Sequence, residues 1–232
     1  MLDQAFESLK KFDWGTPLSE VSGIEDAVVA SHTDAGLCKD LEGRLIAALS
    51  SGISNDAKGY VCRKLAQIGS PAAVPALAAL LPDEANAHLA RQALERIPGA
   101  EAAQALRDAV GKLSGKLKIG VIGSLGARRE ASAVPTLAGL LGDADPAIAR
   151  SAALALQAIS SAEAARVLET AIQAGTGDKL LLADALLTCA EAFLASGKST
   201  EASAIYESLA GDGHPRLVRL AADRGLLACL SK

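Results

Sequence analysis

The strongest constraint on the fold of this chain is that it repeats itself. The segment 93–106, ALERIPGAEAAQAL, returns at 155–168 as ALQAISSAEAARVL, with eight of fourteen positions identical. The segment 71–81, PAAVPALAALL, returns at 131–141 as ASAVPTLAGLL, with seven of eleven identical. The two shifts, 62 and 60 residues, nearly agree. A fixed period of this length is typical of stacked repeats and not of a single globular core.

The composition favours helices as the repeated element. Hydrophobic residues make up 50% of the 232 residues but aromatic residues only 3%, so the core must be built from Ala, Leu, Ile and Val. Ala and Leu are strong helix formers, and small side chains let helices approach closely. The net charge of −4 argues against a generally basic nucleic-acid binder.

Turn residues divide the chain into helical pairs of about 30 residues. Ser70 and Pro71 suit the start of a helix, as cap and first-turn residue, and Pro98 with Gly99 ends the helix after it. The pattern predicts the pairs 41–49 with 60–68, 71–81 with 89–97, 100–113 with 117–125, 131–141 with 146–159, 162–174 with 179–194 and 201–210 with 216–230. We therefore expect an all-α solenoid of about six antiparallel pairs, wound as a right-handed superhelix with second helices on its concave face.

The ends of the stack are predicted to differ from its middle. Residues 1–40 read as an irregular helical cap, with helices over 2–12 and 21–31 and with Trp14 and two of the three Phe residues. An atypical end unit is expected because it must cover one open face of the stack. The expected division is a cap at 1–40, repeats at 41–196 and a closing unit at 197–232.

The internal pattern of the pairs resembles short HEAT-like repeats. Its elements are an AVPxLxxLL first helix, an Asp in the turn and an Arg entering an Ala-rich second helix. They stand in two successive copies at Ala73, Val74, Leu77, Leu80, Leu81, Asp83 and Arg91, and at Ala133, Val134, Leu137, Leu140, Leu141, Asp143 and Arg150. The resemblance covers roughly 41–230. It implies that Asp83 and Asp143 cap second helices and that each Arg reaches the Asp of a neighbouring unit.

Two further resemblances concern the ends. The start, AFExLKxxDWG-like at 5–15, is similar to HEAT-repeat segments of large multidomain bacterial proteins, which implies a module related to a longer protein and no particular activity. Near the other end the spacing is similar to a tetratricopeptide repeat, through Ala192, Phe193, Gly197, Ala202, Tyr206 and Leu209. Tetratricopeptide grooves often bind peptides, but a C-terminal cap is the simpler interpretation.

Residue patterns for catalysis and for cofactor or metal binding are missing from the sequence. His32, His88 and His214 form no HE pair or HxxxH spacing, and the four cysteines are widely separated and are interpreted as small buried hydrophobes. The segment 120–126, GVIGSLG, is not a phosphate-binding loop, and its glycines are expected to allow close helix packing. We predict no catalytic, cofactor or metal residues.

One stretch has an unusual charge balance. Between 91 and 129 there are eight basic residues against three acidic ones, whereas residues 1–57 carry ten acids against four bases. We favour a solvated face, and a polyanion or partner patch remains the alternative. That patch would consist of Arg107, Lys112, Lys116, Lys118, Arg128 and Arg129.

The sequence thus predicts a non-catalytic scaffold for an unidentified protein partner. Two alternatives stay open: polyanion or nucleic-acid binding through the local basic patch, and an accessory subunit of an enzyme, like the HEAT-like modules of tetrapyrrole lyases. No signal peptide or membrane span is visible, so a cytoplasmic location is expected if Met1 is the native start.

Overall fold

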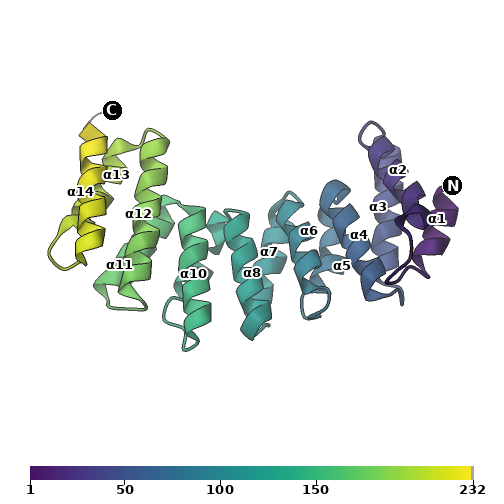
Figure 1. Cartoon of the computed structure of the whole chain (residues 1–232), viewed down its shortest axis with the longest axis horizontal. Coiled ribbons are helices and arrows are strands. Elements are labelled where there is room, and N and C mark those ends of the chain that lie inside the picture. The colour runs from purple at the N-terminus through teal and green to yellow at the C-terminus, as the bar shows by residue number, and fades with distance from the viewer. Residues whose placement is uncertain (231–232) are drawn as a thin grey trace. The chain divides into compact units, whose positions relative to one another are not determined.

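The computed structural model describes residues 1–230, and over these residues the fold is entirely helical, with no β-strand. It contains fourteen α-helices, α1 to α14, and three short 3-10 helices, η1 to η3 (Figure 1). The chain forms two compact units, the first from Met1 to Ser124 and the second from Leu125 onward. The boundary lies within helix α8. The predicted division at residues 40 and 196 stays a prediction.

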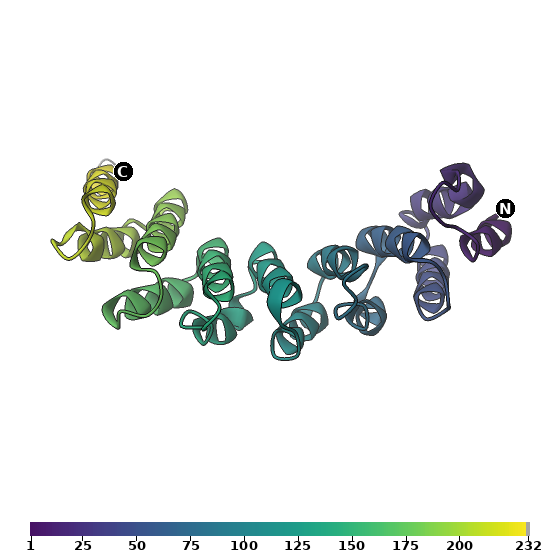
Figure 2. The same cartoon turned by 60° about the horizontal axis from the view of Figure 1, so that its bottom comes forward.

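The first unit contains the segment predicted to form a cap and three helical pairs, the last of which ends beyond the boundary. Its helices are α1 (Leu2–Leu9), η1 (Leu18–Val21), α2 (Ser22–Ser31), α3 (Ala35–Leu49), α4 (Asn55–Ile68), η2 (Pro71–Ala73), α5 (Val74–Ala78), α6 (Ala87–Arg96), α7 (Ala100–Val110) and α8 (Gly115–Ala127), which runs across the boundary. The second helices α4 and α6 pack side by side, and the first helices α5 and α7 form the layer behind them (Figure 2).

The second unit repeats this arrangement. Its elements are η3 (Ala131–Ala133), α9 (Val134–Ala138), α10 (Pro146–Ile159), α11 (Ala162–Gln173), α12 (Lys179–Ala195), α13 (Ser199–Ala210) and α14 (Arg216–Leu230). Here α12 packs on both α10 and α14, and α9 packs on α11. Together the two units contain the six pairs that the sequence predicted, with α3 to α14 as their members.

Two predicted helices are wrong in detail. The expected continuous helices 71–81 and 131–141 are each a 3-10 turn followed by a five-residue α-helix. The reason is Pro75 in one copy and Pro135 in the other, since proline has no N–H to donate to the carbonyl four residues earlier. After each short helix the chain continues with bonds to the third preceding residue, as from Leu80 N to Leu77 O at 3.1 Å.

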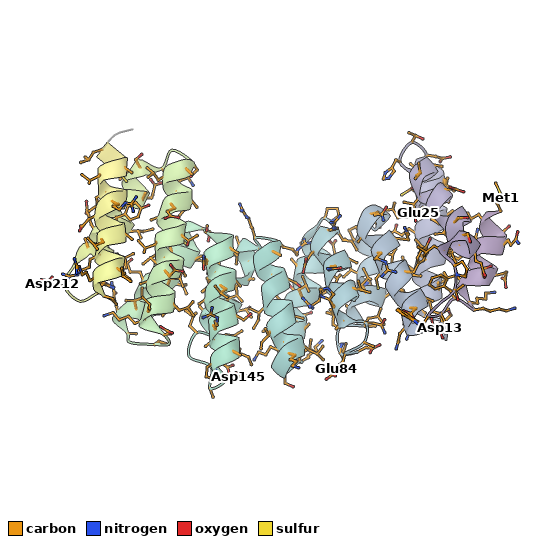
Figure 3. All side chains as sticks on the ribbon, in the orientation of Figure 1. Met1, Asp13, Glu25, Glu84, Asp145 and Asp212 are labelled. Carbon is orange, nitrogen blue, oxygen red and sulfur yellow. The ribbon has the colours of Figure 1, made fainter. Side chains whose placement is uncertain are left out.

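Side-chain caps fix the starts of many helices, which explains why their boundaries were predictable. Ser70 accepts a hydrogen bond from Ala72 N, as expected, and Ser161 accepts one from Ala164 N. Asp145, labelled in Figure 3, caps α10 by accepting from Ala147 N. Such caps satisfy backbone amides that have no partner within the helix.

The core consists of the repeated aliphatic positions. Leu77 and Leu137, the equivalent leucines of the two copies, are both fully buried. In the second unit, a glycine allows close contact between the end of α8 and α10. A Cβ at Gly126 would lie 2.9 Å from Cα of Ala155, which confirms the packing role predicted for this glycine. Gly123 is exposed with open space around it, so for Gly123 the packing prediction is wrong.

The aromatic residues of the N-terminal segment are only partly buried. Phe12 is buried and its ring centroid lies 5.7 Å from that of Tyr60 on α4. Trp14, by contrast, is 90% exposed in the loop before η1. None of the helices within residues 1–230 has the length and apolar character needed to span a membrane.

Candidate partner groove between α4 and α6

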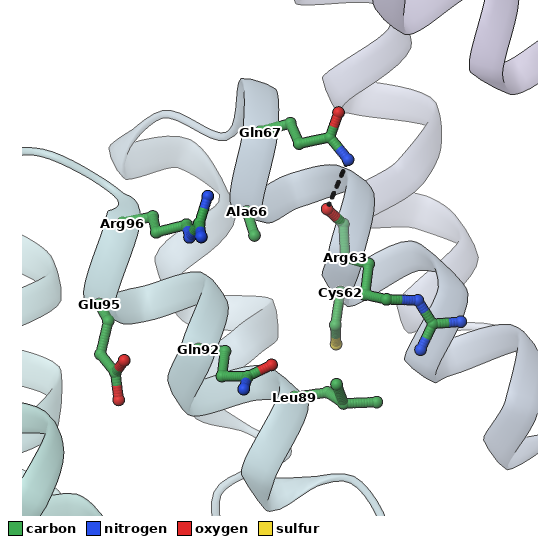
Figure 4. A pocket seen from close by; sticks show the side chains of 8 residues that line it. All are labelled: Cys62, Arg63, Ala66, Gln67, Leu89, Gln92, Glu95 and Arg96. Carbon is green, nitrogen blue, oxygen red and sulfur yellow. Dashed lines mark hydrogen bonds between the residues drawn. The ribbon is translucent and has the colours of Figure 1, made fainter.

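A groove of about 330 Å³ lies between the second helices α4 and α6 of the first unit (Figure 4). Helix α4 contributes four lining residues and α6 contributes four. They are Cys62, Arg63, Ala66 and Gln67 on α4, and Leu89, Gln92, Glu95 and Arg96 on α6. Leu89, Gln92 and Arg96 extend from α6 toward α4 in Figure 4, whereas Glu95 points down the view and not toward α4.

Helix geometry places the polar lining residues on exposed faces. Arg63 and Gln67 are four residues apart on α4, and Gln92 and Arg96 are four apart on α6, so each pair lies on one side of its helix. All four side chains are exposed. Gln67 Nε2 donates to the backbone oxygen of Arg63 at 3.3 Å. The groove therefore presents two guanidinium groups and two amides to solvent.

The carboxylate of the groove, Glu95, is engaged with the next helix. The hydroxyl of Ser124, a fully buried residue of α8, donates to Oε1 of Glu95 at 2.6 Å. Arg91 Nη1 in turn donates to Ser124 Oγ at 3.1 Å and to the backbone oxygen of Gly120 at 2.8 Å. This network ties α6 to α8 and holds one carboxylate oxygen of Glu95 on Ser124.

Arg91 differs from the expectation drawn from the repeat pattern. It was expected to reach an Asp of a neighbouring unit, but its guanidinium binds Gly120 and Ser124 and lies 3.3 Å from His88 Nδ1. The turn between α7 and α8 carries Ser114 and no Asp, so no carboxylate stands there to accept. Burial lowers the pKa of Arg91, and Glu95 acts in the opposite direction.

Gly120 makes room for this guanidinium. A Cβ at Gly120 would lie 2.7 Å from Arg91 Cζ. The packing role predicted for Gly120 is therefore confirmed, with a side chain as the packed group.

The thiol of Cys62, which lines the groove, is not activated as a nucleophile. Cys62 is fully buried, and burial raises the pKa of its thiol to about 11, although Arg63 opposes the shift. Because the thiolate is the reactive form, a thiol with this pKa is inert near neutral pH. The prediction of a small buried hydrophobe is confirmed for Cys62 and for Cys189, whereas Cys38 and Cys229 are only half-buried.

A second hollow adjoins the groove on the other side of Arg63. It has a volume of about 400 Å³ and is lined by Leu18, Ser19, Ser22, Glu25, Tyr60, Arg63 and Lys64. Lys64 Nζ forms an ion pair with Glu25, so its charge is compensated. Burial raises the pKa of Tyr60 to about 12, with Glu25 adding to the rise and Arg63 opposing it. Arg63 thus stands between an amide-lined groove and a largely apolar hollow.

The turn before α6 holds a cluster of polar side chains, of which the sequence analysis singled out only Asp83. Asp83 accepts from Ala85 N at 3.0 Å and from Asn86 Nδ2 at 2.7 Å, so it has a structural role within the turn. The expectation that Asp83 caps the second helix is wrong, because Asn86 is the residue at the N-cap of α6 and no side-chain bond caps this helix. The fully buried Asn86 also donates to Asn55 Oδ1 at the start of α4, at 2.8 Å. In the second copy, Asp143 accepts from Asp145 N at 2.9 Å, and Asp145 caps α10. The cap expected from Asp143 is therefore formed by the residue two positions later.

The six basic residues of the proposed patch fall into both units. Arg107 on α7 donates to Gln104 Oε1 at 2.5 Å, Lys112 lies in the following turn, and Lys116 and Lys118 begin α8. These four belong to the first unit. Arg128 and Arg129 follow the last turn of α8 and belong to the second unit. The grouping of the six residues as one patch stays a prediction.

Two histidines, His88 and His214, lie near the starts of helices α6 and α14. His88 is exposed in the first turn of α6, with Nε2 3.1 Å from Gln92 Nε2. His214 precedes α14, and burial together with Lys179 lowers its pKa. Within residues 1–230 there is no group of three His, Cys, Asp or Glu side chains able to hold a metal ion.

Comparison with known proteins agrees with this fold. A family model described as HEAT repeats matches residues 109–187. Among solved structures, the archaeal HEAT-like repeats protein from Thermococcus onnurineus NA1 aligns with 100% of this chain and 97% of its own length, at 15% identity and a TM-score of 0.53. A comparison with curated protein sequences gave no match.

These findings, with the helical pairs described above, show that the chain has the fold of a HEAT-like repeat protein. Proteins with this fold commonly act as interaction scaffolds. The right-handed sense of the superhelix stays a prediction.

Proposed function

We propose that this chain is a non-catalytic protein-binding scaffold and that the groove between α4 and α6 binds an extended, acidic segment of a protein partner. The observation that carries the proposal is the chemistry of the groove. Arg63 and Arg96 are exposed cations, and the carboxylate of Glu95 is held by Ser124. Guanidinium groups form strong bidentate hydrogen bonds with carboxylates, so acidic side chains fit this lining.

The amides and the adjoining hollow favour an extended peptide over a small anion. Gln67 and Gln92 each offer a donor and an acceptor, which is what an extended backbone requires. The hollow beyond Arg63, with Leu18 and Tyr60, suits an apolar side chain of the same segment. Leu18, which lines this hollow, is 65% exposed and can add apolar contact area to the interface.

A peptide-display selection against the intact chain tests the proposal. We expect enrichment of peptides with two or more acidic residues and an apolar residue, and loss of their binding to Arg63→Glu/Arg96→Glu. The matched control is Lys11→Glu/Arg166→Glu, which changes two exposed basic residues outside the groove and shifts the net charge equally. Enrichment of peptides without acidic residues, or equal loss of binding in both variants, would refute the groove assignment.

Nucleic-acid binding through the six basic residues remains the second candidate. The excess of basic over acidic residues between 91 and 129 is the only support for this candidate, so we rank it below peptide binding by the groove.

A further inference from the structure

A hollow of about 450 Å³ lies between α12 and α14 in the second unit, and we call it the α12–α14 hollow. Helix α12 packs on α10 on one side and on α14 on the other (Figure 1). Six of the nine residues that line the hollow are apolar, and the other three are Arg150, Asp178 and Asp184. The second unit therefore has a largely apolar hollow with a few charged groups at defined places.

Several of the apolar side chains in this hollow are open to solvent. Leu180 on α12 is 55% exposed and Leu217 on α14 is 79% exposed, so each wall contributes an exposed leucine. Leu187, which is half-buried, follows Leu180 by seven residues. At about 100° per residue, these two leucines of α12 point within roughly 20° of each other. Apolar side chains gathered on one surface mark interaction sites more often than scattered ones do.

An exposed carboxylate stands between the two leucines of α12. Asp184 lies four residues after Leu180 and three before Leu187, which places it on the same side of the helix. Within residues 1–230 its carboxylate forms no ion pair and no hydrogen bond. Asp178, by contrast, caps α12 by accepting from the backbone amides of two residues in its first turn. Asp184 is therefore the acid of this hollow that is available to a ligand.

The surface around the hollow is acidic as well as apolar. A neighbouring hollow of about 430 Å³ shares Arg150, Asp178 and Leu181 with the α12–α14 hollow and adds Asp143 to the lining. The combined lining holds three carboxylates against one guanidinium. Interfaces pair surfaces of opposite charge, so a cationic and apolar ligand fits this surface. Because Arg150 repels a cation at its own end, the basic group of the ligand belongs at Asp184.

We propose that the α12–α14 hollow is a second docking surface and that it binds an amphipathic helix of a protein partner, with a lysine or arginine of that helix paired to Asp184. Apolar side chains of the partner helix then contact Leu180 and Leu187 on either side of this ion pair, and Leu217 across the hollow. A helix can present apolar, basic and apolar residues in this order on one face, at spacings of four and three residues. This surface selects the opposite charge to the groove between α4 and α6 and does not depend on that groove.

Fluorescence anisotropy with designed peptides tests the proposal on the intact chain at physiological salt. The probe is a labelled peptide with Leu and Lys on one helical face and Ala and Gln on the other. We expect saturable binding, at least about tenfold tighter than that of two matched peptides, one with Glu in place of Lys and one with Gln in place of Leu. Equal or tighter binding of either matched peptide would overturn the proposal.

Charge reversal at Asp184 tests the ion pair. Asp184→Arg should weaken binding of the Leu/Lys peptide about tenfold, because an attraction becomes a repulsion. The matched control is Asp40→Arg, which makes the same change of charge at an exposed residue of α3 and should leave the affinity unchanged. Equal loss of affinity in the two variants would show that only the net charge of the chain matters, which contradicts the proposal.

Removal of exposed leucines tests the apolar contact. Leu180→Ser/Leu217→Ser should also weaken binding about tenfold. Its control, Val29→Ser/Leu227→Ser, alters two exposed apolar residues outside the hollow and should bind as the native chain does. The circular dichroism spectra should stay unchanged, because all four side chains are already exposed. Affinity that is insensitive to the first pair would overturn the proposal.

Two further measurements separate this proposal from its alternatives. The groove variant Arg63→Glu/Arg96→Glu should retain binding of the Leu/Lys peptide, so this proposal and the groove proposal fail independently. Sedimentation of the native chain should show no self-association through the hollow. A dimer that is lost in Leu180→Ser/Leu217→Ser would assign the hollow to a second copy of the chain and would overturn the proposal.

Discussion

The amide of Asn86 donates to the carboxylate of Asp83 at 2.7 Å, and this bond links the turn before α6 to the start of α4 through the second bond of Asn86 to Asn55. The bond from Asn86 is the main reason that the pKa of Asp83 lies below its usual value of 3.8. The cluster links α4 and α6, the two helices that form the groove. Protonation of Asp83 should therefore change the free energy of unfolding.

We predict that Asp83 stabilises the fold above pH 4 and loses this effect in acid. A carboxyl group whose pKa is lowered by folding favours the native state fully above its unfolded pKa, and the gain disappears as pH falls through the folded pKa. The free energy of unfolding of Asp83→Asn should be lower than that of the native chain by at most about 1 kcal/mol at pH 7, because the carboxylate is partly solvated. Urea unfolding between pH 7 and pH 2 should show the difference shrinking. A constant difference, or one equal to that of the exposed neighbour Glu84→Gln, would contradict the prediction.

Two glycines of helix α8 should respond oppositely to the same substitution. Gly126→Ala should destabilise the chain by about 1 to 3 kcal/mol, because the new methyl group would press on the backbone of Ala155. Gly123→Ala should stabilise it by roughly 0.5 to 1 kcal/mol, since Gly123 has open space around it and Ala is the better helix former. Chemical unfolding measures both. Equal effects of the two substitutions would show that α8 and α10 do not pack as described.

The four cysteines should differ in the rate at which they react with a thiol reagent. With a buried side chain and a pKa of about 11, Cys62 should react with a thiol reagent at pH 8 only after unfolding, although it lines the groove. The half-buried Cys38 and Cys229 should react first. Peptide mapping after timed labelling assigns each rate. Fast labelling of Cys62 in the native chain would mean that solvent and reagent reach this thiol through the groove. Thiol chemistry would then have to be considered there.

The basic stretch should prove to be a solvated face. We expect a mixed DNA or RNA probe to show no micromolar gel shift with the native chain. The variant with Lys116, Lys118, Arg128 and Arg129 changed to Glu should behave identically. If the stretch bound phosphate, the native chain would bind with an affinity that falls steeply with salt, and the variant would not. That second outcome would favour the polyanion alternative.

Much of the fold could be predicted because repeats supply the same evidence more than once. The bounds expected for 146–159 and 216–230 agree with α10 and α14, since Pro146 and Asp145 mark one start and the apolar period marks both helices. The interrupted first helices could have been foreseen from Pro75 and Pro135, whose missing N–H is a local property. Leu77 and Leu137 were identified as equivalent core positions by the repeat alone, and both are buried.

The candidate site was less accessible to sequence reasoning. Arg63, Gln67 and Gln92 belong to no motif, and Arg96 entered only as one of eight basic residues between 91 and 129. The available signal was polar residues four apart on second helices, as at Gln92 and Arg96, but this spacing also describes any solvated helix face. The partners of Arg91 required three dimensions, because Gly120 and Ser124 lie about thirty residues away on another helix.

The most direct test of the groove assignment is a binding titration with one selected acidic peptide, followed by fluorescence anisotropy. We predict that Arg63→Glu/Arg96→Glu weakens binding at least about tenfold, since charge-assisted hydrogen bonds are lost, while Lys11→Glu/Arg166→Glu leaves it unchanged. A peptide with its acidic residues replaced by Lys should bind the groove variant better than it binds the native chain. Equal affinity of the native chain and the groove variant for the acidic peptide would contradict the account.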